Sequence, residues 1–212
     1  MPVVYLLRRN TASVEKTRTT LEEADWQLGG CSESLQDALA EIAVRMPDIV
    51  ACDLRLNDGH AMLVAHELGQ LPVRPQLLLL SPNVDDLQLF AALCAGANAY
   101  HVDVGTGLTD ALTALHQRRA NLCPLMARQA LAAFGAERSP VALASQMAAA
   151  KDQSAAGRQI DQAARHLLSL LSHGLLTSEV AQAWQLTQVD VEQRIWRIVR
   201  LLHVRSRELQ IV

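Results

Sequence analysis

The sequence is poor in aromatic residues and lacks the side-chain patterns on which most enzymes depend. Only 3% of its 212 residues are aromatic, so Ala and Leu, which both favour helices, supply most of the apolar mass. It contains no nucleophile–base set, no glycine-rich loop for phosphate and no ligand spacing typical of a metal site. We therefore expect no catalytic residues, no metal and no cofactor, with free thiols at Cys31, Cys52, Cys94 and Cys123.

Long apolar runs are also missing. No stretch approaches the ~20 residues that a helix needs to cross a bilayer. The N-terminus lacks the charged start, the apolar stretch and the cleavage site of a signal peptide. Free thiols are typical of a reducing cytosol. These features predict a soluble, cytoplasmic protein that does not contact a membrane.

The formal net charge of -3 is distributed unevenly along the chain. Residues 1–150 carry 11 basic and 16 acidic side chains, whereas residues 151–212 carry 8 and 6. The weakly basic C-terminal part permits a polyanionic partner such as nucleic acid but does not require one.

The first 120 residues alternate short apolar runs with helical patterns. Residues 49–52 and 77–80 are apolar throughout, as is typical of parallel strands covered on both faces. The predicted fold class is therefore α/β, with a doubly wound, five-stranded parallel sheet of the flavodoxin-like kind. Strands are predicted at 3–8, 26–30, 48–53, 76–81 and 98–102, and helices at 11–24, 33–45, 59–69, 85–95 and 106–119.

Charged and polar side chains collect where the predicted strands end. Arg8 and Arg9 follow the first apolar run, Asp53 ends the third, Ser81 ends the fourth, and Asp103 follows the fifth. In a doubly wound fold the functional crevice lies at the C-terminal ends of the strands. We therefore expect these side chains to meet in one pocket that holds both signs of charge.

The rest of the chain is predicted to be helical. Residues 121–157 are interpreted as a helical or flexible linker, and residues 158–212 as a small all-α domain. Within that domain Gly174 ends one helix, and two further helices follow at 178–185 and 188–202. The tight break between the last two is typical of a helix-turn-helix.

Capping residues and apolar spacing support these helices. Thr177 or Ser178 can cap the second helix, and Thr187 with Asp190 forms a capping box for the third. The inner face of the third helix is predicted from apolar residues at helical spacing, namely Val191, Ile195, Ile198 and Leu202.

Both halves of the chain resemble one known family. Residues 170–181, LLSHGLLTSEVA, align without gaps with the scaffold-helix motif of LuxR-type helix-turn-helix domains, and the similarity continues to Arg207. Residues 48–59, DIVACDLRLNDG, resemble a receiver domain, as do Ser81 and the GANAY segment at 96–100. Together they resemble a bacterial response regulator of the FixJ/NarL type. The resemblance implies a receiver-like domain followed by a DNA-binding domain.

The resemblance also implies a chemistry for the strand ends. Receivers of this family are phosphorylated on the acid that corresponds to Asp53. The reaction uses Mg²⁺, which two acids after the first strand help to hold through oxygen ligands. A Lys after the fifth strand pairs with the phosphoryl group. A Ser or Thr after the fourth strand bonds to that group and couples to an aromatic residue on the fifth.

This sequence departs from the family where the reaction depends on charge. Arg8 and Arg9 replace the acid pair and Asp103 replaces the Lys, whereas Ser81 and Tyr100 are kept. Two guanidiniums repel Mg²⁺ and offer it no oxygen ligand. The sequence therefore predicts a degenerate phosphoacceptor pocket in a pseudo-receiver domain at residues 1–120.

Two interpretations of that pocket remain open. Arg8 or Arg9 could reach Asp53, Asp103 or both in bidentate ion pairs. Alternatively, both arginines extend to solvent and Asp53 is an idle relic. Both interpretations predict that the protein is not phosphorylated in the conventional way.

The resemblance places the third helix of the C-terminal domain in the major groove of DNA. Arg and Gln suit contacts with phosphates and base edges, whereas Glu192 stands where the family usually has a basic residue. Trp184 is expected in the core, and Trp196 could contact DNA, a dimer partner or the linker. The arginines could also form an ordinary solvated face. The candidate DNA contacts are Gln188, Glu192, Gln193, Arg194, Trp196, Arg197 and Arg200.

The sequence therefore predicts a transcriptional regulator that binds double-stranded DNA as a homodimer, because LuxR-type domains bind paired half-sites. Its input would be something other than phosphate. The alternative is a protein-interaction module, an adaptor or antagonist that pairs with another regulator and binds DNA weakly or not at all. A small ligand in the modified pocket is a further open input.

Overall fold

This computed structural model describes residues 1–22, 24–83, 87–135 and 160–209. The chain divides into two compact units, Met1–Ala120 and Asn121–Val212. Among the described residues, no helix has both the length and the apolar character to cross a membrane.

Five parallel strands form the sheet of the first unit. Their order across the sheet is β2-β1-β3-β4-β5, and each neighbouring pair is parallel. The chain therefore changes direction across the sheet between β1 and β3, and the C-terminal ends of these two strands border the switch point. The predicted doubly wound α/β fold is confirmed. The strands are β1 (Val3–Leu7), β2 (Gln27–Ser32), β3 (Ile49–Asp53), β4 (Gln76–Ser81) and β5 (Ala99–Val102).

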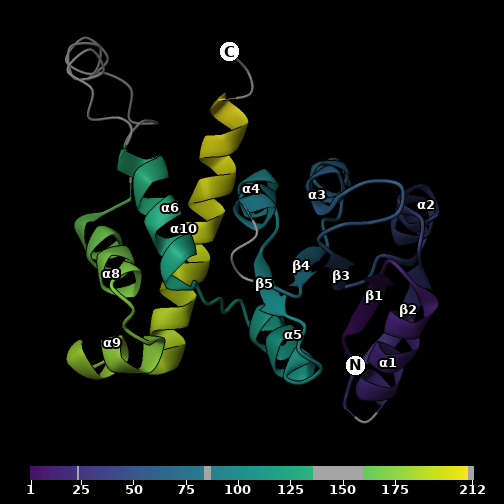
Figure 1. The fold of residues 1–212 in the computed structure, drawn as a ribbon, viewed down its shortest axis with the longest axis horizontal. Helices are drawn as coiled ribbons and strands as arrows, with labels where there is room; N and C mark the ends of the chain where they lie inside the picture. Colours follow the sequence, from purple (N-terminus) through teal and green to yellow (C-terminus); the bar gives the residue numbers. More distant parts are fainter. Residues whose placement is uncertain (23, 84–86, 136–159, 210–212) are drawn as a thin grey trace. The chain divides into compact units, whose positions relative to one another are not determined.

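Helices cover both faces of this sheet. Figure 1 shows α1 and α5 on one face and α2, α3 and α4 on the other, in agreement with the packing of α1 on α5 and of α3 on α2 and α4. The predicted helix ends differ from the observed ones by less than one turn. The helices are α1 (Thr11–Glu22), α2 (Leu35–Arg45), α3 (Ala61–Leu68), α4 (Leu87–Ala95) and α5 (Leu108–His116).

The central strands have the continuous apolar character that the sequence predicts. Both faces of β1, β3 and β4 are buried, because helices lie on each side. Each fully buried Leu or Val stabilises the fold by about 1.5–3 kcal/mol relative to an exposed one. One face of the sheet packs on apolar residues of α1 and α5, which include Val14, Leu21, Leu108, Leu112 and Leu115.

The second unit is helical in its described part. Its helix α8 contacts α6, α9 and α10, and α9 also contacts α10. The residues predicted for the inner face of the last helix, Val191, Ile195, Ile198 and Leu202, are all buried. The helices are α6 (Pro124–Gly135), α8 (Gln162–Ser172), α9 (Thr177–Ala183) and α10 (Gln188–Leu209).

The helix ends of this unit agree with the sequence in part. Gly174 has a φ of 96° and follows His173, the residue that caps the end of α8, as predicted for a C-terminal glycine. Helix α9, in contrast, starts after Leu176, whose N–H donates to Glu179 Oε2 at 2.7 Å. The predicted cap at Thr177 or Ser178 is wrong, because Thr177 is already in the first turn and its side chain is buried.

Helix α10 begins as predicted and ends later. Thr187 N–H donates to Asp190 Oδ2 at 3.0 Å, and Asp190 N–H donates to Thr187 Oγ1 at 3.2 Å, which completes the capping box. The helix continues to Leu209 instead of ending at residue 202. No Gly or Pro interrupts residues 203–209, so the sequence contains no strong signal to stop it.

Helix α6 occupies the first part of the predicted linker. It packs on α8 through a buried face that contains Met126, Ala127, Ala130 and Phe134. Arg128 Nε also donates to the carbonyl of Ser172 at 3.0 Å. Residues 121–135 therefore form part of the second unit. The remainder of the predicted linker, 136–157, lies outside the described residues.

Candidate functional site

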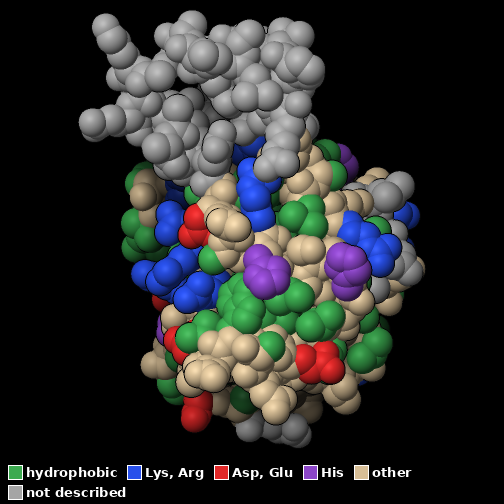
Figure 2. Space-filling view, turned by 90° about the vertical axis from the view of Figure 1, so that its left-hand side faces the viewer, with side chains coloured by type: hydrophobic (Ala, Val, Ile, Leu, Met, Phe, Trp, Pro, Cys, Tyr) green, Lys and Arg blue, Asp and Glu red, His purple; other side chains and the backbone are tan. Residues whose placement is uncertain are grey.

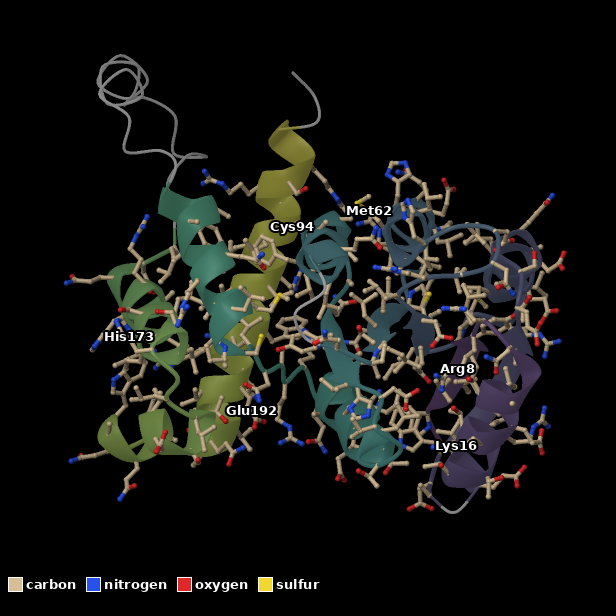
Figure 3. All side chains as sticks on the ribbon, in the orientation of Figure 1. Arg8, Lys16, Met62, Cys94, His173 and Glu192 are labelled. Carbon is tan, nitrogen blue, oxygen red and sulfur yellow. The ribbon has the colours of Figure 1, made fainter. Side chains whose placement is uncertain are left out.

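Arg8 directly follows strand β1, and its charged side chain is buried at the C-terminal ends of the strands of the first unit. The residue is only 6% exposed, and Figure 3 shows it beside β1 and α1. Its Nε donates to Asp53 Oδ1 at 3.1 Å, and its Nη2 lies 3.0 Å from the same oxygen. Arg8 and Asp53 are thus joined through two nitrogens and one carboxylate oxygen.

The same guanidinium reaches two further segments. Nη2 also lies 2.5 Å from Asp103 Oδ2, after β5, and Nη1 donates to Thr17 Oγ1 of α1 at 2.7 Å. The side chains of Asp53 and Asp103 are 14% and 27% exposed. Since partly buried ion pairs are less screened than surface pairs, this charge cluster holds β1, α1, β3 and the end of β5 together.

Arg9 contributes its backbone and not its charge. Its N–H donates to Asp53 Oδ2 at 2.8 Å, and its carbonyl accepts from Asn57 Nδ2 at 2.8 Å. The Arg9 residue is exposed. The structure therefore contains the predicted ion pairs with both acids, and Arg8 alone makes them. The Arg8–Asp53 pair differs from the predicted bidentate pair, in which two nitrogens bond to two carboxylate oxygens. Here both nitrogens contact Asp53 Oδ1, and Asp53 Oδ2 accepts from the Arg9 N–H.

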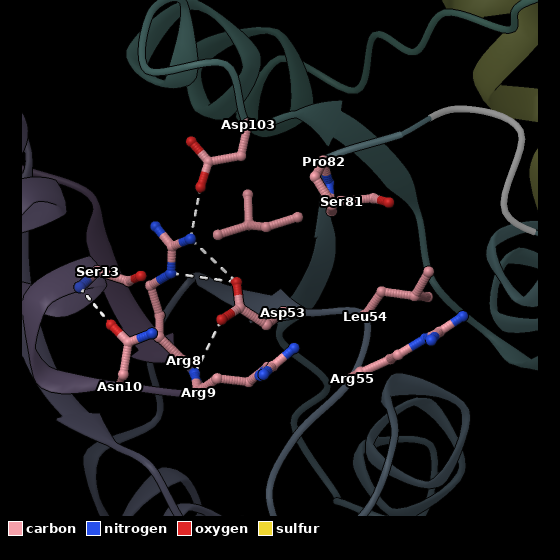
Figure 4. Close-up of a pocket in the computed structure, with 11 residues that line it drawn as sticks. Arg8, Arg9, Asn10, Ser13, Asp53, Leu54, Arg55, Ser81, Pro82 and Asp103 are labelled. Atoms are coloured by element: carbon pink, nitrogen blue, oxygen red, sulfur yellow. Dashed lines mark hydrogen bonds and ion pairs between the residues drawn. The ribbon is translucent and has the colours of Figure 1, made fainter.

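Ser81 and Tyr100 do not take part in the charge cluster in this structure. Ser81 Oγ donates to the carbonyl of Asn83 at 2.8 Å and accepts from the Asn83 N–H at 3.3 Å. In Figure 4 its side chain points away from Asp53. Tyr100 is partly buried and pairs with Leu79 in the sheet. It is not among the described residues that line the pocket.

The strand ends enclose a pocket of about 480 Å³, shown in Figure 4. Asp53 and Asp103 offer oxygen atoms of the kind that Mg²⁺ prefers. The Arg8 guanidinium lies between them and within hydrogen-bond distance of both. A divalent cation at this place would meet a fixed positive charge, so the residues present do not fit Mg²⁺. The lining residues are Arg8, Arg9, Asn10, Ser13, Asp53, Leu54, Arg55, Leu80, Ser81, Pro82 and Asp103.

Thr17 and Asn57 are site residues that the sequence did not reveal. Thr17 is 3% exposed and lies on α1, two turns after the start of the helix. Its position against Arg8 depends on how α1 rotates about its own axis. A Thr in an amphipathic helix gives no signal of that contact, whereas the presence of Asn57 in the receiver-like segment at 48–59 was at least a hint.

The predicted DNA-contact residues lie on α10 of the second unit, where Figure 3 shows Glu192. Glu192 is buried, and its Oε1 accepts from Gln188 Nε2 at 2.7 Å. Gln193 and Trp196 are partly buried. The exposed members of the predicted set are Gln188, Arg194, Arg197 and Arg200. The predicted DNA contacts stay predictions, and the burial of Glu192 does not favour a contact through its side chain.

Two of these arginines lie over tryptophan rings. The guanidinium carbon of Arg200 lies 5.0 Å from the centroid of the Trp196 ring, and that of Arg194 lies 5.9 Å from the Trp184 ring. Trp184 is partly buried and not in the core as expected. Its ring lies 5.5 Å from that of His166. Figure 2, viewed from the side of α8 and α9, shows hydrophobic and histidine side chains gathered on this face.

Comparisons with known proteins were made for the sequence and for the fold. No family model matches the chain. Over 180 residues the chain is 28% identical to the DNA-binding transcriptional activator DevR/DosR of Mycobacterium tuberculosis, which covers 84% of this chain and 77% of that protein. Over 95 residues it is 32% identical to the KDP operon transcriptional regulatory protein KdpE of Escherichia coli, which covers 45% and 42%.

The fold is similar to that of a complete response regulator. The structure of RcsB from Salmonella enterica serovar Typhimurium, bound to a promoter, superposes with a TM-score of 0.52 at 15% identity. That match covers 95% of this chain and 92% of RcsB. The predicted fold resemblance is confirmed, because a receiver-like unit is followed by a helical unit in this chain as in RcsB.

Proposed function

We propose that this protein is a DNA-binding transcriptional regulator that works without conventional Mg²⁺-dependent phosphorylation of Asp53. Two lines of support come from different units of the molecule. The sequence relatives are transcriptional regulators, and DevR/DosR binds DNA. The strand ends of the first unit hold a guanidinium where the family holds a metal ion.

The position of Arg8 is the observation that carries the proposal. Its nitrogens lie 2.5–3.1 Å from oxygens of Asp53 and Asp103. Arg9 N–H occupies the second oxygen of Asp53. Phosphorylation of Asp53 would require its carboxylate to give up these partners and to attack a phosphoryl group without metal assistance. Arg8 instead supplies a permanent positive charge that joins β3 to the end of β5.

Incubation with acetyl phosphate and Mg²⁺ tests the receiver half of the proposal. We expect the intact mass of the wild-type chain to stay unchanged. The Asp53→Asn variant, treated in the same way, identifies any background modification at other carboxylates. A stoichiometric mass gain in the wild type that is absent from Asp53→Asn contradicts the proposal.

The second half of the proposal assigns DNA binding to α10 of a homodimer. Arg194, Arg197 and Arg200 are exposed on this helix, and arginines suit contacts with phosphates and guanine edges. A homodimer would present two such helices to paired half-sites. The described residues of the second unit thus combine a helix-turn-helix with a cationic outer face.

Gel shifts against genomic fragments at two salt concentrations test this assignment. We expect sequence-selective binding that weakens steeply as salt rises, because phosphate contacts release counterions. Arg197→Ala should weaken binding to every fragment, whereas Arg74→Ala, in an exposed loop of the first unit, should not. Equal effects of the two variants would show a response to net charge alone.

One contact favours the alternative function, a protein-interaction module. Glu192 is buried on the predicted recognition helix, and its Oε1 accepts from Gln188 Nε2, so this carboxylate is turned to a neighbour on the same helix. A regulator with this helix would bind DNA weakly and act by pairing with another regulator. No sequence-selective shift, together with a co-purifying partner regulator, favours this alternative.

A further inference from the structure

Trp184 is an aromatic residue outside the core, at the turn between α9 and α10. It caps the end of α9, and α10 begins at Gln188. Its N–H donates to the carbonyl of Val180 at 3.0 Å, which holds the backbone of this residue on the last turn of α9. The residue is partly buried, so part of its surface packs on neighbours and part faces solvent.

The Trp184 ring has neighbours on two other helices. The His166 ring of α8 lies 5.5 Å from it, with the two ring planes inclined by 43°. The guanidinium carbon of Arg194, on α10, lies over the Trp184 ring at 5.9 Å from the centroid. Both His166 and Arg194 are exposed. One indole ring therefore connects α8, α9 and α10 at the surface of the second unit.

We propose that Trp184 is a positioning residue for DNA binding, which holds the Arg194 guanidinium in place for contact with a DNA phosphate. This inference rests on the proposed function, because that function assigns DNA binding to α10. A guanidinium stacks on an aromatic ring through its face and forms hydrogen bonds along its edge. An arginine that lies over a ring can therefore still donate to a phosphate. Trp is also the aromatic side chain that attracts a cation most strongly.

The ring contact lowers the cost of ordering Arg194 on DNA. A long, flexible side chain loses rotamer freedom when it binds, and a contact already present in the unbound protein removes part of that loss. Asp190 is the acid one turn before Arg194. Its Oδ2 accepts from the Thr187 N–H at 3.0 Å and from the Thr187 hydroxyl at 2.6 Å, so this carboxylate is held at the start of the helix.

Arg200 provides a comparison within the same helix. Its guanidinium carbon lies 5.0 Å from the centroid of the Trp196 ring, and Trp196 stands one turn earlier on α10. Helix geometry alone brings that pair together. Trp184 and Arg194 belong to different elements and meet because α9 packs on α10. A substitution of Trp184 should therefore act on Arg194 and leave Arg200 unaffected.

A double-mutant cycle tests the inference, in gel shifts of the full-length protein with a genomic fragment that the wild type selects. Trp184→Leu keeps an apolar side chain and removes the ring. We expect it to weaken DNA binding by about twofold to fivefold, the range of a cation–π contact at an exposed site. Arg194→Ala should then cost less affinity in the Trp184→Leu background than in the wild type. Trp184→Phe, which retains a ring, should bind DNA more tightly than Trp184→Leu.

Arg200→Ala is the control, because its guanidinium lies over a different ring. Its effect on affinity should agree within about twofold between the wild type and the Trp184→Leu background. Independent effects of Trp184→Leu and Arg194→Ala would make Trp184 a structural residue only and overturn the inference. An unchanged or increased affinity of Trp184→Leu, or an equal coupling to Arg200, overturns it as well. Circular dichroism establishes that each variant is folded, and Trp184→Met takes the place of Trp184→Leu if the latter is not.

Failure of the proposed function gives a different result. If the wild type shifts no genomic fragment selectively, the proposed DNA binding and this inference are overturned together. If the wild type binds selectively and Trp184→Leu binds equally well, the inference alone is overturned.

Discussion

Arg8 Nη1 donates a 2.7 Å hydrogen bond to Thr17 Oγ1, and that hydroxyl in turn donates to the carbonyl of Ser13. The guanidinium therefore has partners on three sides, namely α1, Asp53 and Asp103. A buried charge is tolerated only where its donors are satisfied in this way. Through Thr17, Arg8 is bonded to α1 as well as to the two acids, so one side chain after β1 connects α1, β3 and the end of β5.

Replacing Arg8 with Met should destabilise the protein by about 3–5 kcal/mol, because two carboxylates lose their counter-charge while the apolar stem is kept. Urea unfolding of the full-length chain at neutral pH measures the loss. Arg9→Met is the matched control, since the Arg9 residue is exposed and its backbone contact with Asp53 is retained. That control should lie within about 0.5 kcal/mol of the wild type. Equal stability of the two variants would make Asp53 a solvated relic.

Much of this site could be predicted from the sequence. Apolar runs located the strands, and the convergence of parallel strand ends placed Arg8, Asp53 and Asp103 in one pocket. The choice between Arg8 and Arg9 could not be made. It depends on the direction in which each side chain leaves the backbone after β1, and a one-residue change reverses that direction.

The features that escaped prediction depend on tertiary packing. The sequence predicts a helix cap at Thr177, but Thr177 is buried within the helix. The N–H of Leu176, the residue before the helix, donates to the Glu179 carboxylate. The sequence places residues 124–135 in a helical or flexible linker, yet Met126 and Phe134 are buried on the helix that packs on α8. Helical propensity was visible in both segments, whereas the surface that each would contact was not.

Acidification should destabilise the first unit through His101. Burial lowers the pKa of His101 from its usual 6.5, although the Asp103 carboxylate and a hydrogen bond with the Thr106 backbone oppose the shift. The unfolded chain then binds more protons than the native state below about pH 6.5, so stability present above this pH is lost as the pH falls. His101→Leu should flatten this dependence between about pH 7 and about pH 5.5.

Urea midpoints for the wild type and His101→Leu across that pH interval measure the effect. Carboxylates titrate in both proteins, so the difference between the two profiles isolates the imidazole. His66→Gln is the control, because His66 is exposed on α3. It should leave the profile unchanged. Parallel profiles for the wild type and His101→Leu would contradict the prediction.

Truncation of Phe134 should show that α6 belongs to the second unit. Phe134 is 1% exposed, and the guanidinium carbon of Arg205 lies 5.7 Å from its ring centroid. Phe134→Ala should therefore cost about 3–5 kcal/mol through a cavity and lost burial. A Trp26→Phe background removes the tryptophan of the first unit, so fluorescence follows Trp184 and Trp196. Val204→Ala, at an exposed position of α10, should have little effect. A small loss for Phe134→Ala would mean that α6 is dispensable to this unit.

Glu192 should limit the affinity of α10 for DNA. Its carboxylate places a negative charge on a helix that is otherwise rich in arginine, and like charges repel across the short distances of a protein–DNA interface. Glu192→Gln removes the charge and keeps an acceptor oxygen for Gln188, which now donates to a carboxylate oxygen at 2.7 Å. We expect an affinity gain of about tenfold at low salt that shrinks as salt rises. Glu67→Gln, the same change at an exposed position of α3 in the first unit, should leave affinity unchanged.

The outcome for Glu192→Gln also separates the functions proposed for this helix. A gain in affinity on all DNA fragments identifies the carboxylate as a source of repulsion from phosphates. A loss confined to certain fragments would instead identify it as a base contact, because Glu can accept a hydrogen bond from cytosine N4. If neither the wild type nor the variant binds any fragment, the arginines of α10 form a solvated or protein-binding face. In that case the protein-interaction module becomes the better account of the molecule.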